Sequence, residues 1–232
     1  MSSETLALIA FELVVMVLSI CLHDMAQAWM ANRLGDPTAR MLGRMTMNPV
    51  AHFDLFGMAL WPLIFIWRSP LVLGWGKPVP MTYRNFRGKN GEMLATLAGP
   101  AAQVGAACLA LMALVMMKHA DPGLNASLFT AQALSLRVTG VATVGLPPLF
   151  PIVLFLYFCI LLNLLLAIFN LLPLPFLDGG RILVHFLPYN AAKAFESAGM
   201  WLMIAFMFLG FGVIMAIFLP VLDFFNQLLY AL

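Results

Sequence analysis

Long apolar runs alternate with short, turn-rich polar stretches along this chain. Four runs approach or exceed the roughly 20 apolar residues that a helix needs to cross a bilayer: residues 6–30, 93–117, 149–172 and 200–222. A fifth run, residues 56–75, is broken by Arg68 and Pro70 and spans poorly. The pattern predicts an all-α polytopic membrane protein, and residues 1–232 are expected to form a single membrane-embedded domain.

Composition supports lipid as the main solvent of the chain. Hydrophobic residues make up 63% and charged residues 9%, and the mean hydropathy is +0.97. A soluble domain carries charge on about a quarter of its residues. The net charge of +2 gives no argument for a nucleic-acid partner. The three cysteines stand singly inside apolar runs, so a disulfide framework is not expected.

The positive-inside rule, by which Lys and Arg gather in cytoplasmic loops, tests whether residues 56–75 cross the bilayer. If this run spans, the loop cations divide almost evenly between the two sides. If it is re-entrant, only Lys118 and Arg137 lie opposite the rest. The shared side then carries Arg33, Arg40, Arg44, Lys77, Arg84, Arg87, Lys89, Arg181 and Lys193. The rule favours a re-entrant or β-like hairpin on the cytoplasmic side, beside a hydrated cavity that satisfies its backbone.

Polar side chains inside the first apolar run are the main anomaly of the sequence. Glu12, His23, Asp24 and Gln27 all lie within residues 6–30. Such groups cost several kcal/mol in a span unless they are paired or hydrated, so they indicate a functional site. His23 and Gln27 are four residues apart and share one helix face, as do the ligands of a zinc-binding H-E-x-x-H motif. Here the motif reads H-D-M-A-Q, and these residues alone leave open a metal site or a hydrogen-bonded polar cluster.

A second anomaly ends the run at residues 149–172. The chain there reads N-L-L-P-L-P-F-L-D-G-G over residues 170–180. Two prolines interrupt the helix, because they lack a backbone donor, and the carboxylate of Asp178 follows them. A helix broken inside a membrane protein can deliver a ligand to a buried site.

Together these two stretches resemble the site-2 protease family of intramembrane zinc metalloproteases. That family carries an H-E-x-x-H helix followed later by an N-x-x-P-x-x-x-x-D-G stretch. Blocks between them also resemble the compact bacterial members: residues 34–39, Gly43-Arg44, Asn48-Pro49, His52, Gly74-Trp75, residues 77–80 and residues 98–100. The resemblance covers roughly residues 10 to 188, and the order and spacing of the blocks are more specific than any single motif.

The resemblance implies a site-2-protease-like helix bundle that cleaves membrane-embedded polypeptides with a zinc-activated water. By position in the motifs, His23 is the first zinc ligand, Gln27 the second and Asp178 the third. Asp24 occupies the position of the catalytic carboxylate. Asn170 is expected to position the substrate backbone or to bridge helices.

Two of these positions depart from the family pattern. Gln27 offers a neutral amide oxygen in place of an imidazole nitrogen, so zinc is expected to bind weakly or not at all. Asp24 is one methylene shorter than glutamate, and a misplacement on the order of 1 Å can cost about a hundredfold in rate. His52 either hydrogen-bonds within the hairpin or approaches the site, where it is a candidate for substrate positioning or for a rescued ligand position.

Three functions are therefore open. The first is an intramembrane metalloprotease with impaired or lost peptide hydrolysis, and the second is a pseudoprotease adaptor that binds membrane helices without cutting them. The third, more remote, is a proton-coupled transporter that uses Glu12, Asp24 and Asp178, which the lack of an internal repeat argues against. Glu12 otherwise lines a water path or is a protonated glutamate bonded to another helix. The expected location is the bacterial cytoplasmic membrane, with the site toward the cytoplasm and a transmembrane polypeptide as partner.

Overall fold

The computed structural model describes residues 3–66, 71–138, 140, 141, 143 and 145–232. These residues form helices and no strand, which confirms the predicted all-α class. The long helices are α1 (Ser3–Arg33), α5 (Gly91–Ala120), α7 (Phe150–Leu171) and α10 (Gly199–Ala231). Among the described residues, four helices are long and apolar enough to cross a membrane.

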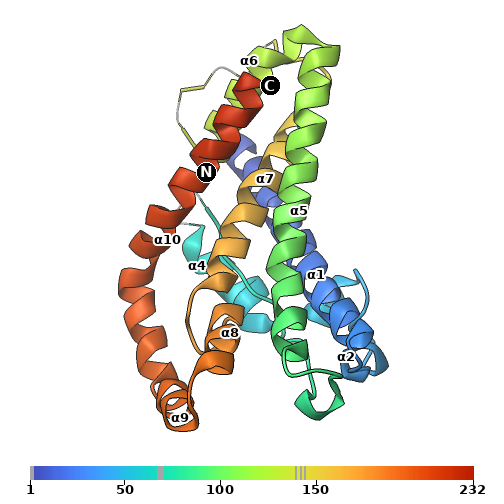
Figure 1. The fold of residues 1–232 in the computed structure, drawn as a ribbon. Helices are drawn as coiled ribbons and strands as arrows, with labels where there is room; N and C mark the ends of the chain where they lie inside the picture. Colours follow the sequence, from blue (N-terminus) through green and yellow to red (C-terminus); the bar gives the residue numbers. More distant parts are fainter. Residues whose placement is uncertain (1–2, 67–70, 139, 142, 144) are drawn as a thin grey trace.

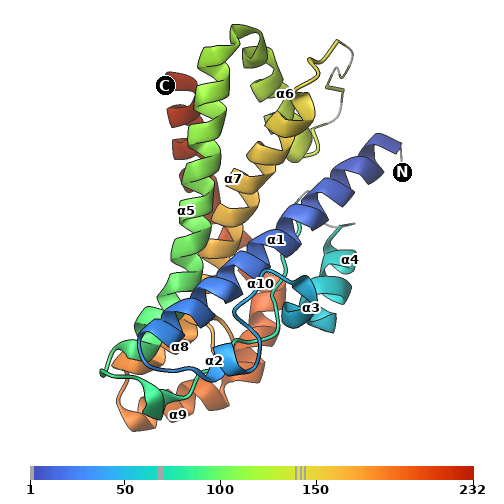
Figure 2. The same cartoon turned by 90° about the vertical axis from the view of Figure 1, so that its right-hand side faces the viewer.

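Shorter helices cap the two ends of this bundle (Figure 1). At one end lie α2 (Thr38–Met41), α8 (Asp178–Phe186) and α9 (Tyr189–Ser197). At the other end lie α6 (Asn125–Ser135) and the C-terminus. The two views agree on this arrangement (Figure 2), so consecutive long helices run in opposite directions.

Helix α7 is the central element of the bundle. It packs against α1, α5, α6 and α10. Its sequence is hydrophobic on all sides, as expected of a helix surrounded by other helices. Residues 160–167 are all buried, among them Leu161, Leu162 and Leu165 with no exposed surface. The core of the protein therefore lies along α7.

The ambiguous run at residues 56–75 does not form a fifth spanning helix. It begins with a π-helical stretch, η1 (Leu55–Leu60), and continues as α4 (Trp61–Phe65). The chain then returns over residues 71–80 without helix or strand. The first half of the predicted hairpin is thus helical rather than β-like. Arg68 and Pro70, which break the apolar run in the sequence, lie outside the described residues.

A buried ion pair holds both limbs of this hairpin to α1. The Glu12 carboxylate, only 1% exposed, accepts hydrogen bonds from the backbone N–H of Val72 at 2.6 Å and from Arg137 Nη2 at 2.8 Å. Arg137 also donates to the carbonyl oxygen of Ile66 at 2.8 Å. Glu12 is therefore paired with a cation, which none of the roles expected for it from the sequence included.

Asp36 joins the end of α1 to the distant turn at residues 82–85. This fully buried carboxylate accepts bonds from the hydroxyl and backbone N–H of Thr38, the backbone N–H of Thr82 and the side-chain amide of Asn85. Burial alone would raise the pKa of Asp36, but these hydrogen bonds outweigh it and hold the pKa below its ordinary value. The carboxylate thereby fixes the path of the chain below the site.

Replacing Arg137 by leucine would leave the Glu12 carboxylate buried without its cation. Removing one partner of a buried ion pair costs about 3–5 kcal/mol. We therefore expect Arg137→Leu to lower the unfolding temperature of the detergent-solubilised protein, and Arg84→Leu, at an exposed position, to leave it unchanged. Equal unfolding temperatures for the two variants would contradict a stabilising role for the pair.

Asp36→Asn is expected to reduce stability by about 1–3 kcal/mol at neutral pH. A carboxyl whose pKa is lowered by folding stabilises the protein above its unfolded pKa and loses that contribution as the pH falls through its folded pKa. The gap in unfolding temperature between parent and variant should therefore stay constant near neutrality and narrow below about pH 4. A gap that is the same at every pH would mean that the charge of Asp36 contributes nothing.

Candidate functional site

A cavity of about 600 Å³ opens between α1, the hairpin, the broken end of α7 and α10. Its walls are mostly apolar, and aromatic rings form much of them. Trp61 of α4 packs against Trp75, Trp75 against Phe169 of α7, and Phe169 against Phe206 of α10, with ring centroids 5.4–6.4 Å apart. Pockets of this size, apolar with a few convergent polar groups, are typical ligand sites.

Helix α1 presents the polar groups of one wall. His23, Asp24 and Gln27 are all buried and all line the cavity. The 3.6-residue repeat places His23 and Gln27 on the same side of the helix, one turn apart. Gly99 of α5 faces this side, because a Cβ built there would lie 2.4 Å from His23 Nε2. The absence of a side chain at position 99 therefore lets α5 approach the histidine ring.

The opposite wall comes from the chain that follows α7. This helix ends at Leu171, and α8 begins at Asp178. A Cβ at Gly179 would lie 2.1 Å from the carbonyl oxygen of Leu171, and one at Gly180 would lie 1.9 Å from that of Leu174. Both glycines allow α8 to fold tightly back on the break, and this packing turns Asp178 toward α1.

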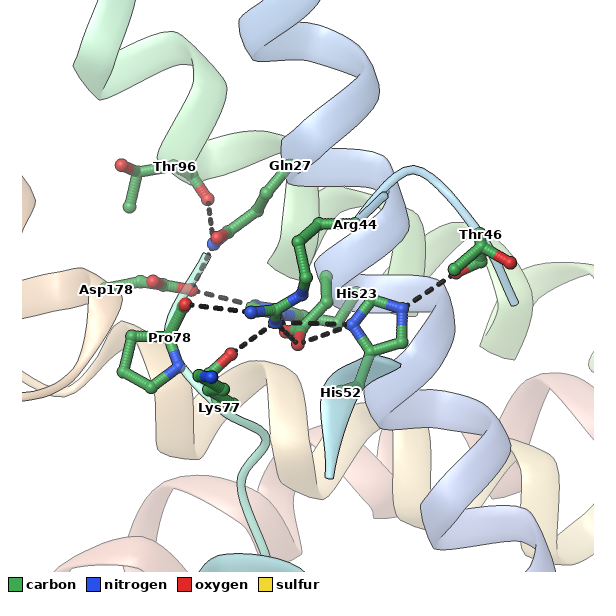
Figure 3. A network of polar contacts seen from close by, with 10 residues as sticks. His23, Gln27, Arg44, Thr46, His52, Lys77, Pro78, Thr96 and Asp178 are labelled. Atoms are coloured by element: carbon green, nitrogen blue, oxygen red, sulfur yellow. Dashed lines mark hydrogen bonds and ion pairs between the residues drawn. The ribbon is translucent and has the colours of Figure 1, made fainter. Parts of the chain in front are cut away.

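Asp178 meets His23 and Gln27 directly (Figure 3). Its Oδ2 atom lies 2.8 Å from His23 Nε2 and accepts a hydrogen bond of 2.8 Å from Gln27 Nε2. The same amide nitrogen of Gln27 donates to the carbonyl oxygen of Thr96 at 3.1 Å. The structure thus brings together three of the residues predicted from the two motifs, although 155 positions separate His23 from Asp178.

A second set of contacts surrounds Asp24. Its Oδ1 atom lies 3.1 Å from His23 Nδ1, while Oδ2 lies 3.0 Å from His52 Nδ1 and 3.2 Å from Arg44 Nη2. Arg44 also donates to the backbone carbonyls of Lys77 and Pro78 (Figure 3). Asp24 therefore ties α1 to both sides of the hairpin.

The residues present do not fit a three-ligand zinc centre. Atoms that share a tetrahedral zinc lie roughly 3.3 Å apart, since each ligand is about 2.0–2.2 Å from the metal, whereas His23 Nε2 and Asp178 Oδ2 are at hydrogen-bond distance. Gln27 faces Asp178 through its NH₂ group, which has no lone pair for a metal. Turning the amide over would set its oxygen against the Thr96 carbonyl. Within the described residues, no group of three or more His, Cys, Asp or Glu side chains is placed to hold a metal ion.

The predicted residues differ in their relation to the cavity. Asn170 lines it together with the four motif residues. His52 is fully buried outside the cavity wall, between Asp24 and the carbonyl oxygen of Thr46 at 2.7 Å. These contacts fit both roles expected of His52, and the individual roles of these residues stay predictions.

Sequence reasoning did not assign Arg44, Thr96 and Gly99 to the site. Arg44 is one of many loop cations and belongs to a block of the resemblance, but only the structure shows that it is buried, with 6% of its surface exposed. Thr96 contributes a backbone carbonyl, which no side-chain pattern reveals. Ala98-Gly99-Pro100 is one of the blocks of the resemblance, and its glycine makes the contact with His23.

Comparison with known proteins identifies the family of this chain. The sequence profile of peptidase family M50 matches residues 11–212. This chain belongs to that family, the site-2 proteases. A protein of Bacillus subtilis (strain 168) named "Putative zinc metalloprotease YwhC" is 31% identical over 205 residues, which cover 88% of this chain and 81% of the relative. No solved structure matches the chain significantly.

Membership, together with the four apolar helices, makes this an integral membrane protein. Zinc is the metal expected for the family and appears in the name of the relative. By position in the motifs, Gln27 departs from the histidine of the family pattern and Asp24 departs from its glutamate.

Adding one methyl group at position 99 tests the contact between α5 and His23. Gly99→Ala must displace the histidine ring, and such overpacking costs about 1–3 kcal/mol. Gly105→Ala in the same helix is the control, since no atom lies within 4 Å of its Cβ position, and alanine there is expected to be neutral or to stabilise the helix by up to about 1 kcal/mol. Thermal unfolding in detergent measures both, and similar effects of the two variants would rule out close packing at His23.

Proposed function

We propose that this chain is a site-2 protease family member that binds membrane-embedded polypeptides in the cavity and in which zinc-dependent peptide hydrolysis is impaired or lost. The observation that carries the proposal is the orientation of Gln27. Its amide nitrogen donates to both Asp178 and the Thr96 carbonyl, so the Gln27 atom that faces Asp178 is a hydrogen-bond donor and not a metal ligand. Without three suitable donors, a catalytic zinc has no tight site.

The position of Asp24 supports the same proposal. Both of its oxygens are in contact with cationic or ring-nitrogen partners, from His23 on one side and from His52 and Arg44 on the other. A general base must be within reach of the proton that it abstracts in the bound substrate. Asp24 is shorter than the family glutamate and is held at the protein side of the cavity by these three partners.

The cavity walls support a polypeptide ligand. Apolar and aromatic side chains from α4, α7 and α10 surround the polar centre, and an apolar membrane segment can bury its side chains against them. Asn170 contributes an amide that can bond a peptide backbone. A pseudoprotease adaptor is the case in which hydrolysis is completely lost. The orientation of Gln27 supports this case and the case of impaired hydrolysis equally.

We place the protein in a bacterial cytoplasmic membrane with the cavity toward the cytoplasm. The positive-inside rule supports this orientation, because the loops around α2, α8 and α9 carry most of the cations. The proton relay considered for a transporter gains no support, since Glu12 is paired with Arg137 and does not line the cavity.

Restoring the family residues tests the proposal. The double variant Asp24→Glu/Gln27→His is expected to raise both the zinc content of the detergent-purified protein, measured by mass spectrometry, and any cleavage of a transmembrane peptide. Adding Asp178→Asn to it should abolish both gains. Gln132→His, on α6, is the control for a histidine added far from the site.

Two results would count against the proposal. A double variant that bound no more zinc than the parent would refute the assignment of these residues to a metal site that has lost its zinc affinity. Near-stoichiometric zinc in the parent, lost in Asp178→Asn alone, would show that Gln27 or another residue completes a working centre, and hydrolysis would then be intact.

A further inference from the structure

Five ionisable side chains line the cavity, and four of them have partners within the protein. His23, Asp24 and Asp178 belong to the network around the motif residues. Asp54 caps η1 by accepting the backbone N–H of Gly57 at 2.7 Å. The fifth is Arg181 of α8, which makes no side-chain hydrogen bond or ion pair with any residue in the described part of the chain.

The place of Arg181 in α8 directs it toward the ligand space. It follows Asp178 by three residues, so the two side chains lie on the same side of the helix, about 4.5 Å apart along its axis. Both line the cavity, and Arg181 is half-buried. A molecule that reaches Asp178 from this side therefore passes the guanidinium.

An arginine without a partner at this position favours an anionic ligand. Its guanidinium stays charged in proteins and carries five N–H donors in a planar fork. Next to apolar walls, such a charge gains strongly from an anion that accepts two parallel hydrogen bonds. The nearby carboxylates do not supply it, because Asp178 Oδ2 is shared by His23 and Gln27, and no oxygen of Asp54 or Asp178 lies within 4.0 Å of the Arg181 nitrogens.

We propose that Arg181 is a specificity residue of the cavity and binds a carboxylate carried by the polypeptide that occupies it, one helical turn beyond Asp178. The inference rests on the proposed function, since it assigns a chemical feature to the same ligand. The occupant is then an apolar membrane segment with an acidic side chain, or its own C-terminal carboxylate, at the level of α8. Purely apolar segments bind more weakly.

Two synthetic probes test this assignment directly. Both are apolar leucine–alanine helices with an amidated C-terminus and a neutral dye. One has a single glutamate near its C-terminal end, and the other has glutamine there. Fluorescence anisotropy with the detergent-purified full chain gives the affinity of each. We expect the glutamate peptide to bind on the order of tenfold more tightly than its twin, because a charge-assisted bidentate bond replaces a neutral one.

Variants separate recognition from a structural role. Arg181→Gln should remove the preference for glutamate by weakening the glutamate peptide much more than the glutamine peptide, while Arg181→Lys should restore part of the preference. Arg84→Gln, at an exposed position outside the cavity, is the matched control and should change neither affinity. Equal weakening of both peptides by Arg181→Gln would overturn the proposal in favour of a structural role.

The remaining outcomes show which of two claims fails: the carboxylate preference of Arg181 or the binding of polypeptides in the cavity. If the parent binds both peptides equally, Arg181 does not select a carboxylate, although polypeptide binding stands. If it binds neither, the proposed function fails and the inference fails with it. Nanodiscs of phosphatidylcholine with and without phosphatidylglycerol form the last arm: Arg181-dependent enrichment of phosphatidylglycerol, without a preference between the peptides, would assign the residue to a lipid phosphate and overturn the carboxylate.

Discussion

The hydrogen bonds that Asp178 accepts from His23 and Gln27 connect the first helix of the bundle to the chain beyond the broken end of α7. Inside a bilayer, a polar side chain has little water to bond with, so an unsatisfied group costs several kcal/mol. These contacts therefore constrain more than the site. They fix how close α1 and α8 lie, and Gly99 and Gly179 provide the close backbone approach that makes the contacts possible.

The hairpin, which also lines the cavity, is likewise held by hydrogen bonds between buried polar groups. At one end, Arg44 and His52 both bond to Asp24. Arg44 also donates to the backbone carbonyls of residues 77 and 78. At the other end, Glu12 and Arg137 bond to backbone groups on either side of residues 67–70. Two charged clusters, centred on Glu12 and Asp24 of α1, thus hold an apolar hairpin that does not span.

Helix packing and metal binding place different demands on the side chain at position 27. Gln27 connects α1 to α5 and α8 through two donated hydrogen bonds. Metal binding would require a lone pair from the same position, directed to a point shared with His23 and Asp178. A substitution can therefore keep the helices in place while it removes a ligand, and this is how a family member can retain its cavity when its hydrolysis is impaired.

Sequence by itself determined the all-α class, the long apolar helices and the family, because apolar runs of sufficient length and ordered motif blocks are local features of the chain. It also located His23, Gln27 and Asp178 in one site, through helical spacing and the resemblance. Only the tertiary structure decided which atom of Gln27 faces Asp178, that Arg44 is buried beside Asp24, and that Glu12 pairs with Arg137. Those contacts join residues 20 to 151 positions apart, and the distances and orientations that define them exist only once the helices have packed.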